Sequence, residues 1–113
     1  MKTHLLAERS LDLSVDIVKL CDGIERHGVL KNQLLRSATS IGANIHEGVY
    51  ASSGGDFVNK YQISLKECYE TEYWLKIMVR TGIITEEMFA NLQQQCGSIR
   101  RMLISSIRTA KGS

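Results

Sequence analysis

The sequence has no proline and only two phenylalanines among its 113 residues. At the average proline usage of roughly 5%, a chain of this length would carry five or six. Proline interrupts helices and marks turns, so its absence favours long helices and argues against a loop-rich or all-β fold. No apolar run approaches the ~20 residues that a membrane-spanning helix needs, and the first residues show no signal-peptide pattern. We therefore expect an all-α protein without a membrane segment.

Cysteine is scarce and widely spaced. Cys21, Cys68 and Cys96 are odd in number and form no C-x-x-C pair, which argues against a disulfide framework and against a cysteine-rich zinc site. Each lies near an apolar line of a predicted helix. We expect buried free thiols, as in proteins of the reducing cytoplasm.

Motifs for metal, cofactor or nucleophilic chemistry are also missing. His4, His27 and His46 lie in separate segments, and no glutamate is followed by histidine three residues later, the spacing that di-iron bundles use. The glycine patterns that hold nucleotide phosphates and the nucleophile-elbow motif are absent. The sequence therefore predicts no metal, no cofactor and no enzyme.

The overall composition is that of an ordinary globular chain. Apolar residues make up 43% and charged residues 23%, with a formal net charge of +2. This size gives room for one hydrophobic core, so we expect a single domain over residues 1–113. The charge is only mildly basic, well short of a dedicated nucleic-acid-binding protein.

Apolar residues recur at helical spacing in four segments separated by short breaks. Short breaks between long helices predict an antiparallel up-and-down four-helix bundle. We expect Ser53 and Thr85 to cap the third and fourth helices, and Gly82 to end the third. The expected helices cover residues 7–22, 29–51, 56–80 and 86–110.

The first segment carries two apolar lines nearly opposite one another. One line is Leu13, Ile17, Leu20 and Ile24, and the other is Leu11, Val15 and Val18. An outer helix of a monomeric bundle needs an apolar arc of only a little over ~100°. The second line therefore predicts a contact beyond the chain's own core, such as a partner subunit.

The other three helices each present one main core line. The predicted lines are Leu30, Leu34, Ala38, Ile41, Ile45 and Val49; then Phe57, Tyr61, Leu65, Cys68, Leu75 and Val79; then Phe89, Leu92, Cys96, Ile99, Leu103, Ser106 and Ala110. The last alternates steps of three and four residues, as coiled-coil seams do.

Polar residues border the core lines of the second and third helices. Antiparallel packing would bring Glu47 to Lys60 and Asn44 near Ser64 or Glu67. One interpretation is a carboxylate site with perturbed pKa values. The alternative, which we prefer because no nucleophile or metal ligand is near, is a structural network that fixes helix register or a subunit contact. Its members would be Ser40, Asn44, Glu47, Lys60 and Glu67.

Basic residues are the other candidate site. Arg101 and Arg108 share one face, and the last seventeen residues contain no acid. Such cations can neutralise phosphates, but they can also simply complement the dipole at a helix C-terminus. In a ring of subunits the patch would repeat and its field would grow. The candidate phosphate contacts are Arg36, Arg100, Arg101, Arg108 and Lys111.

The block from Ser40 to Gly48, SIGANIHEG, resembles the S-I-[PG]-x-N-I-x-E-G signature of the proteins encoded in 23S rRNA intervening sequences, also described as ribosomal proteins. The stretches 33–38, where Leu35 replaces a common arginine, and 56–75 are also similar to this family. The resemblance implies a left-handed up-and-down bundle that forms a homopentamer and has no established enzymatic activity. The accessory proteins of diversity-generating retroelements are similar in shape, and they are basic pentamers that bind nucleic acid and a reverse transcriptase.

Three hypotheses follow from the residues and the resemblance together. The first is a non-catalytic oligomeric bundle that binds RNA, DNA or a nucleic-acid-handling protein. The second is a protein-binding scaffold without nucleic-acid affinity. The third, which we rank last, is a small enzyme that uses Glu47 or Glu67.

Overall fold

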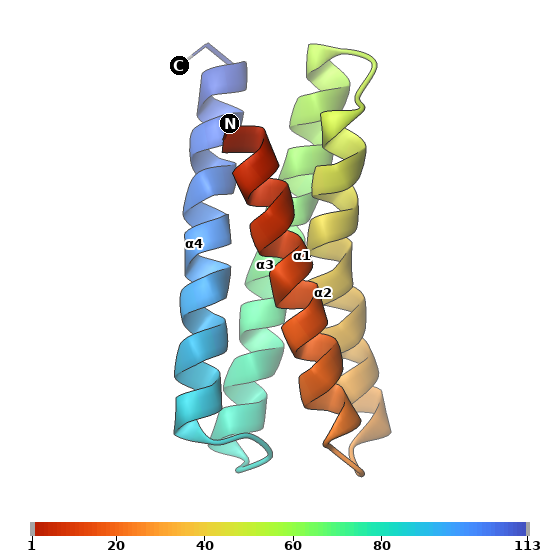
Figure 1. Cartoon of the computed structure of the whole chain (residues 1–113), viewed down its shortest axis with the longest axis vertical. Coiled ribbons are helices and arrows are strands. Elements are labelled where there is room, and N and C mark those ends of the chain that lie inside the picture. Colours follow the sequence, from red (N-terminus) through yellow and green to blue (C-terminus); the bar gives the residue numbers. More distant parts are fainter. Residues whose placement is uncertain (1, 113) are drawn as a thin grey trace.

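The computed structural model describes residues 2–112, with side chains from His4 to Gly112. All regular structure within this range is helical (Figure 1). None of the described helices combines the length and the hydrophobicity needed to cross a membrane. The four helices are α1 (Lys2–Asp22), α2 (Gly28–Val49), α3 (Gly54–Arg80) and α4 (Glu86–Ala110).

The helices form a rod of 43 × 20 × 19 Å in which successive helices run in alternating directions (Figure 1). Each helix packs on its neighbours in chain order, and α4 closes the bundle against α1. Within the described chain α1 and α3 do not contact each other. They are therefore the diagonal pair, and their outward faces lie on opposite sides of the rod.

The predicted caps are present at both helix starts. The Ser53 hydroxyl accepts a hydrogen bond from the Asp56 backbone N–H at 3.1 Å, and the Thr85 hydroxyl accepts one from Met88 at the same distance. Gly82, with φ of 77°, takes the chain out of α3 in a backbone conformation that L side chains rarely adopt. The sequence thus marks these boundaries locally.

The core confirms most of the predicted apolar lines. Leu13 and Ile17 of α1 are fully buried, and so are the central residues of the α2 and α4 lines. All three cysteines are buried and free. The Cys68 thiol donates to the Cys96 carbonyl at 3.3 Å, and its contact with the Cys96 thiol, together with burial, raises the pKa of Cys96. These thiols are packing groups.

Two ends of the predicted lines are wrong. Val49 is 42% exposed because α2 ends there and Gly48 faces the core instead. A Cβ atom at Gly48 would lie 2.6 Å from the Tyr61 ring, so only glycine leaves room for the ring. On α4, Ile107 is buried while Ala110, in the last turn, is exposed.

Buried hydroxyls tie α2 to α3 through the core. The Thr71 hydroxyl contacts the Ser37 hydroxyl at 2.9 Å and also donates to the Glu67 carbonyl of its own helix. About two turns earlier in α3, the Ser64 hydroxyl donates to the Ile41 carbonyl at 2.8 Å. Because buried polar groups are costly without partners, these bonds favour one axial register of α3 against α2.

Candidate functional site

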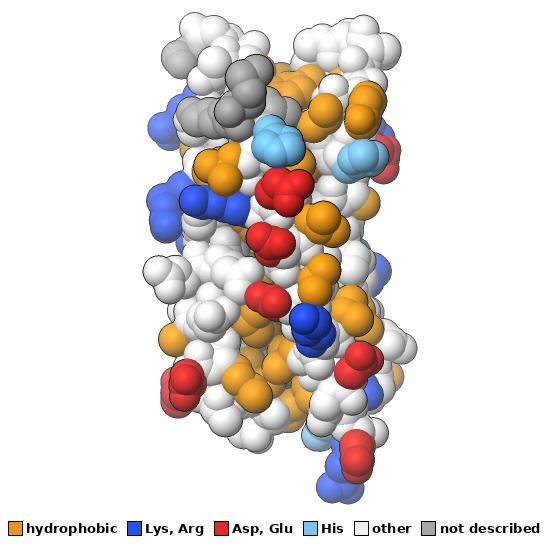
Figure 2. Space-filling model, in the orientation of Figure 1, with side chains coloured by type: hydrophobic (Ala, Val, Ile, Leu, Met, Phe, Trp, Pro, Cys, Tyr) orange, Lys and Arg blue, Asp and Glu red, His pale blue; other side chains and the backbone are white. Residues whose placement is uncertain are grey.

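The outward side of α1 carries an exposed aliphatic ridge, which consists of Leu11, Val15 and Val18. These side chains are 57%, 43% and 43% exposed. In Figure 2 hydrophobic side chains lie along α1 on the side that faces α2. The second apolar line of this helix is therefore left uncovered by the chain's own bundle.

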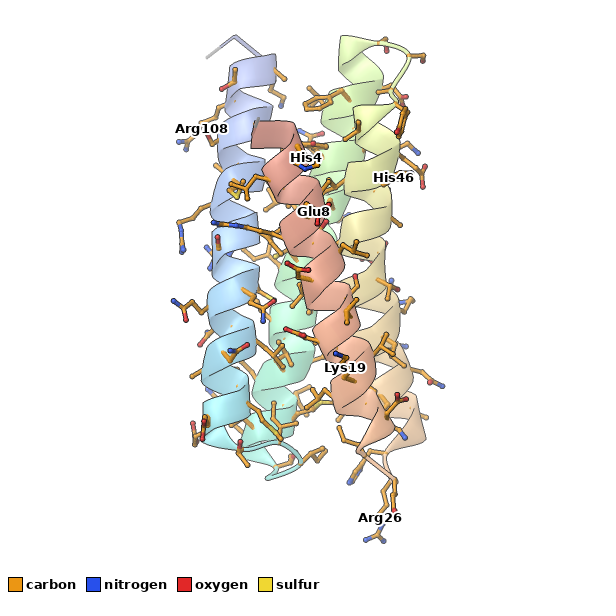
Figure 3. All side chains as sticks on the ribbon, in the orientation of Figure 1. His4, Glu8, Lys19, Arg26, His46 and Arg108 are labelled. Atoms are coloured by element: carbon orange, nitrogen blue, oxygen red, sulfur yellow. The ribbon has the colours of Figure 1, made fainter. Side chains whose placement is uncertain are left out.

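An acidic row runs beside the aliphatic ridge, made up of Glu8, Asp12 and Asp16 at four-residue spacing (Figures 2 and 3). All three are exposed. The Asp16 carboxylate accepts a hydrogen bond from Gln95 of α4 at 3.0 Å. The outward face of α1 thus combines aliphatic contact area with negative charge.

Hollows border α1 on both sides. A groove of about 360 Å³ separates it from α2 and is lined by small residues such as Ser10, Ser14 and Gly42, where the two backbones approach closely. Two adjoining hollows of about 610 and 670 Å³ lie between α1 and α4 and share Asp16 and Lys19. These hollows give side chains of a neighbouring molecule room to insert.

The residues of the predicted polar network do not form one network. Glu47 and Lys60 form an ion pair at 3.0 Å, which raises the pKa of Lys60. Asn44, however, does not reach Ser64 or Glu67, because its amide donates to the Ser40 carbonyl and hydroxyl one turn earlier in α2. Ser64 is already bonded to a backbone carbonyl of α2.

Glu67 belongs to a second cluster, which is centred on Arg36. The Arg36 guanidinium contacts Glu70 at 2.6 Å and Glu67 at 2.8 Å. Hydrogen bonds to Glu70, then to Glu67, raise the pKa of Arg36, and the same arginine lowers the pKa of Glu70. Arg36, one of the five candidate phosphate contacts, is thus already engaged by two carboxylates.

The four candidate cations of α4 and its C-cap, Lys111, divide into two groups. Arg100 is part-buried and contacts the Glu72 carboxylate at 3.2 Å, which raises the pKa of Arg100. Arg101, Arg108 and Lys111 are exposed, and no carboxylate in the described chain pairs with them. Figure 3 shows Arg108 pointing away from the bundle. These three remain available to an external anion.

Glu72 is a buried ion-pair residue that the sequence analysis does not single out. It is 9% exposed, and such burial of a carboxylate requires a partner, which Arg100 supplies. The sequence signal for its burial is its position: it follows Thr71 directly and lies four residues after Cys68, on the core side of α3. The histidines are dispersed, and no metal-binding cluster forms among residues 2–112.

Comparison with known proteins places the geometry in a family. The sequence model of the 23S rRNA-intervening sequence proteins matches residues 2–105. The structure is similar to a crystal structure of a protein with unknown function from the S23 ribosomal protein family of Bacteroides thetaiotaomicron VPI-5482. The two share 42% sequence identity with a TM-score of 0.91, over 96% of this chain and 99% of the other. No curated protein matches the chain.

Proposed function

This chain belongs to the 23S rRNA-intervening sequence protein family, and from this premise we propose that it is a non-catalytic subunit of a homo-oligomer that binds nucleic acid. The antiparallel bundle would be one member of a homopentamer, the assembly that the family resemblance implies. Its buried free cysteines suit the reducing cytoplasm, where RNA and DNA are at hand.

The exposed aliphatic ridge carries the assembly part of the proposal. Leu11 and Val15 expose about half of their surface although every other long apolar line of the bundle is mostly covered. Contiguous exposed apolar surface with a polar border is typical of protein contact sites. The groove of small residues beside the ridge supports close approach of a second helix.

The cations of α4 support the nucleic-acid part. Arg101, Arg108 and Lys111 are exposed near one end of the rod, and a ring of five chains would repeat them five times. At a formal charge of +2 per chain, five chains would carry 5 × 2 = +10. A repeated field of one sign attracts phosphates more strongly than a single patch does.

A structural role for the carboxylates fits their surroundings better than catalysis. Glu47 is held by Lys60 and Glu67 by Arg36, in contacts of 3.0 Å and 2.8 Å. Ion pairs with neighbouring cations occupy both carboxylates, whereas a catalytic carboxyl group has to reach a substrate. This arrangement supports the non-catalytic hypothesis over an enzyme that uses either glutamate.

Light scattering with and without an RNA oligomer tests the proposal. We expect the free protein to have five times the 12.7 kDa mass of one chain. RNA affinity should fall steeply between about 50 and 200 mM salt, because phosphate contacts release counterions. The double variant Arg101→Gln with Arg108→Gln should weaken binding and flatten the salt dependence.

Two outcomes contradict parts of this function. A folded single chain at micromolar concentration would contradict the assembly. An oligomer that binds neither RNA nor DNA at low salt would instead favour the protein-binding scaffold.

A further inference from the structure

The outward face of α3 carries a basic–aromatic stripe that the α4 cations do not include. Lys66, Tyr69, Tyr73, Lys76 and Arg80 are all exposed, with Tyr69 at 52% and Tyr73 at 58%. Their steps of three or four residues keep them within an arc of about 80° at ~100° per residue. Cations and rings therefore alternate along one side of the helix.

The acids that flank this stripe are paired with arginines from the neighbouring helices, which offset two of their three negative charges. On the α2 side, Glu67 and Glu70 are both held by Arg36. On the α4 side, Glu72 is held by Arg100. No carboxylate of the described chain pairs with the three cations of the stripe, Lys66, Lys76 and Arg80. The stripe therefore keeps its positive charge, although α3 also carries acids outside the stripe.

Each of the two tyrosine rings contacts a neighbouring side chain: Arg100 lies over the Tyr69 ring, and Trp74 lies against Tyr73. The Arg100 guanidinium carbon lies 5.8 Å from the centre of the Tyr69 ring, and Trp74 packs edge-on against Tyr73 with ring centres 5.3 Å apart. Such contacts restrict ring motion, so less entropy is lost when a ligand stacks on the rings. Arg100 also joins the stripe to α4, the helix with the exposed cations.

We propose that the basic–aromatic stripe of α3 is a binding site for single-stranded nucleic acid, in which bases stack on Tyr69 and Tyr73 while Lys66, Lys76 and Arg80 contact phosphates. This inference rests on the proposed nucleic-acid binding and names its substrate class. Alternating cations and exposed rings are what sequence-tolerant single-strand sites use.

The spacing along α3 favours a single strand over a duplex. Tyr69 and Tyr73 are separated by ~6 Å along the helix axis at ~1.5 Å per residue. Stacked duplex bases are ~3.4 Å apart and present no free faces, so only splayed bases reach both rings. From Lys66 to Arg80 the stripe extends ~21 Å, enough for a strand of a few nucleotides.

Trp74, the one tryptophan of the chain, gives a direct readout because it touches Tyr73. A uridine oligomer of about ten nucleotides should change Trp74 fluorescence, and a duplex of equal length should bind more weakly. We expect Tyr73→Ala to weaken oligomer binding at least about fivefold, measured by anisotropy of a labelled oligomer. Lys66→Gln with Lys76→Gln should lower the slope of log affinity against log salt by about 1.4, because each phosphate that a lysine neutralises on a single strand adds ~0.7 to that slope.

Matched controls lie outside the stripe. Tyr50→Ala removes a ring that is 76% exposed at the end of α2, and Arg26→Gln removes an exposed cation from the turn between α1 and α2. Both should leave oligomer affinity within about twofold, whereas the matching stripe variants should not.

The outcomes separate this inference from the proposed function. If Arg101→Gln with Arg108→Gln weakens binding but the stripe variants do not, nucleic-acid binding stands and the stripe is not its site. Equal affinity for duplex and single strand, or stripe variants that change the molar mass of the protein alone, would also overturn the inference. The last result would make the stripe a contact between copies of this chain. Complete absence of binding by the unmodified protein would reject the proposed function and this inference together.

Discussion

The outward faces of α1 and α3 lie on opposite sides of the same rod and differ in almost every chemical respect. The α1 face carries the aliphatic ridge and the acidic row, whereas the α3 face carries rings and cations. Both helices bury their opposite side in the core, so the bundle itself does not use either outward face. The proposed assembly would use the first face, and the proposed nucleic-acid site would use the second.

The assembly surface gives the largest expected effect. Leu11→Glu with Val15→Glu places charge on the aliphatic ridge while leaving the buried side of α1 intact. We expect the oligomer to dissociate into folded single chains, seen as a fivefold fall in molar mass with unchanged helical circular dichroism. Tyr73→Glu on α3 is the matched control and should stay assembled. If both variants dissociate, the two faces are not distinct in function.

A core substitution shows how much stability the bundle has independently of either face. Gly48→Ala would place a Cβ 2.6 Å from the Tyr61 ring. Overpacking of this kind costs up to ~3 kcal/mol, and alanine's helix propensity returns ~1 kcal/mol. We expect the free energy of unfolding to fall by about 2 kcal/mol in urea titrations. The affinity of the folded protein for RNA should not change. An unchanged midpoint would mean that the ring moves aside freely.

The tyrosines of α3 differ in burial, because Tyr61 lies in the core whereas Tyr69 and Tyr73 are exposed. Tyr61 is buried, its hydroxyl has no hydrogen-bond partner among the described residues, and burial raises its pKa. Because a buried unsatisfied hydroxyl is unfavourable, Tyr61→Phe should leave stability unchanged or raise it by about 1 kcal/mol. Thermal unfolding measures this, and a loss of stability would show that the hydroxyl is satisfied after all. Nucleic-acid binding should not respond to this buried change.

The smallest effect concerns the acids beside the stripe. Arg36 lowers the pKa of Glu70 below its ordinary value of 4.5, so this pair stabilises the folded state above that pH and the contribution is lost as pH falls through the lowered pKa. The pair is largely exposed, so we expect Arg36→Gln to cost well under about 1 kcal/mol at pH 7. The difference from the unmodified protein should shrink progressively as pH falls below 4.5 in acid unfolding curves. A difference that does not shrink as the solution is acidified would assign another role to Arg36.

Periodicity predicts the interior of this protein better than its surface. Leu13, Ile17 and the central residues of the other lines repeat at helical spacing, so the core follows from sequence alone. Gly48 against Tyr61 could not be predicted, because it depends on how closely two helices approach. The spacing of Asn44 predicts a bond across the bundle, but its amide bonds instead to Ser40, one turn earlier in its own helix.

The sequence alone does not predict the basic–aromatic stripe on α3, and the reason is electrostatic. In sequence, Lys66 and Lys76 stand among glutamates and resemble an ordinary solvated face. Only the fold shows that Arg36 and Arg100, distant along the chain, pair with those glutamates and offset most of their charge. Local charge counting therefore understates the positive field that remains.

The hydroxyl contacts between α2 and α3 have a consequence for how this family can diversify. Sliding α3 by one turn along α2 is unfavourable because two buried hydroxyls would lose their partners. These hydroxyls are Thr71, which contacts Ser37, and Ser64, which bonds to Ile41. The outer side chains of α3 therefore keep a fixed axial position relative to α2 and the rest of the bundle. Substitutions among them can change the chemistry of this face while their places along the rod stay the same.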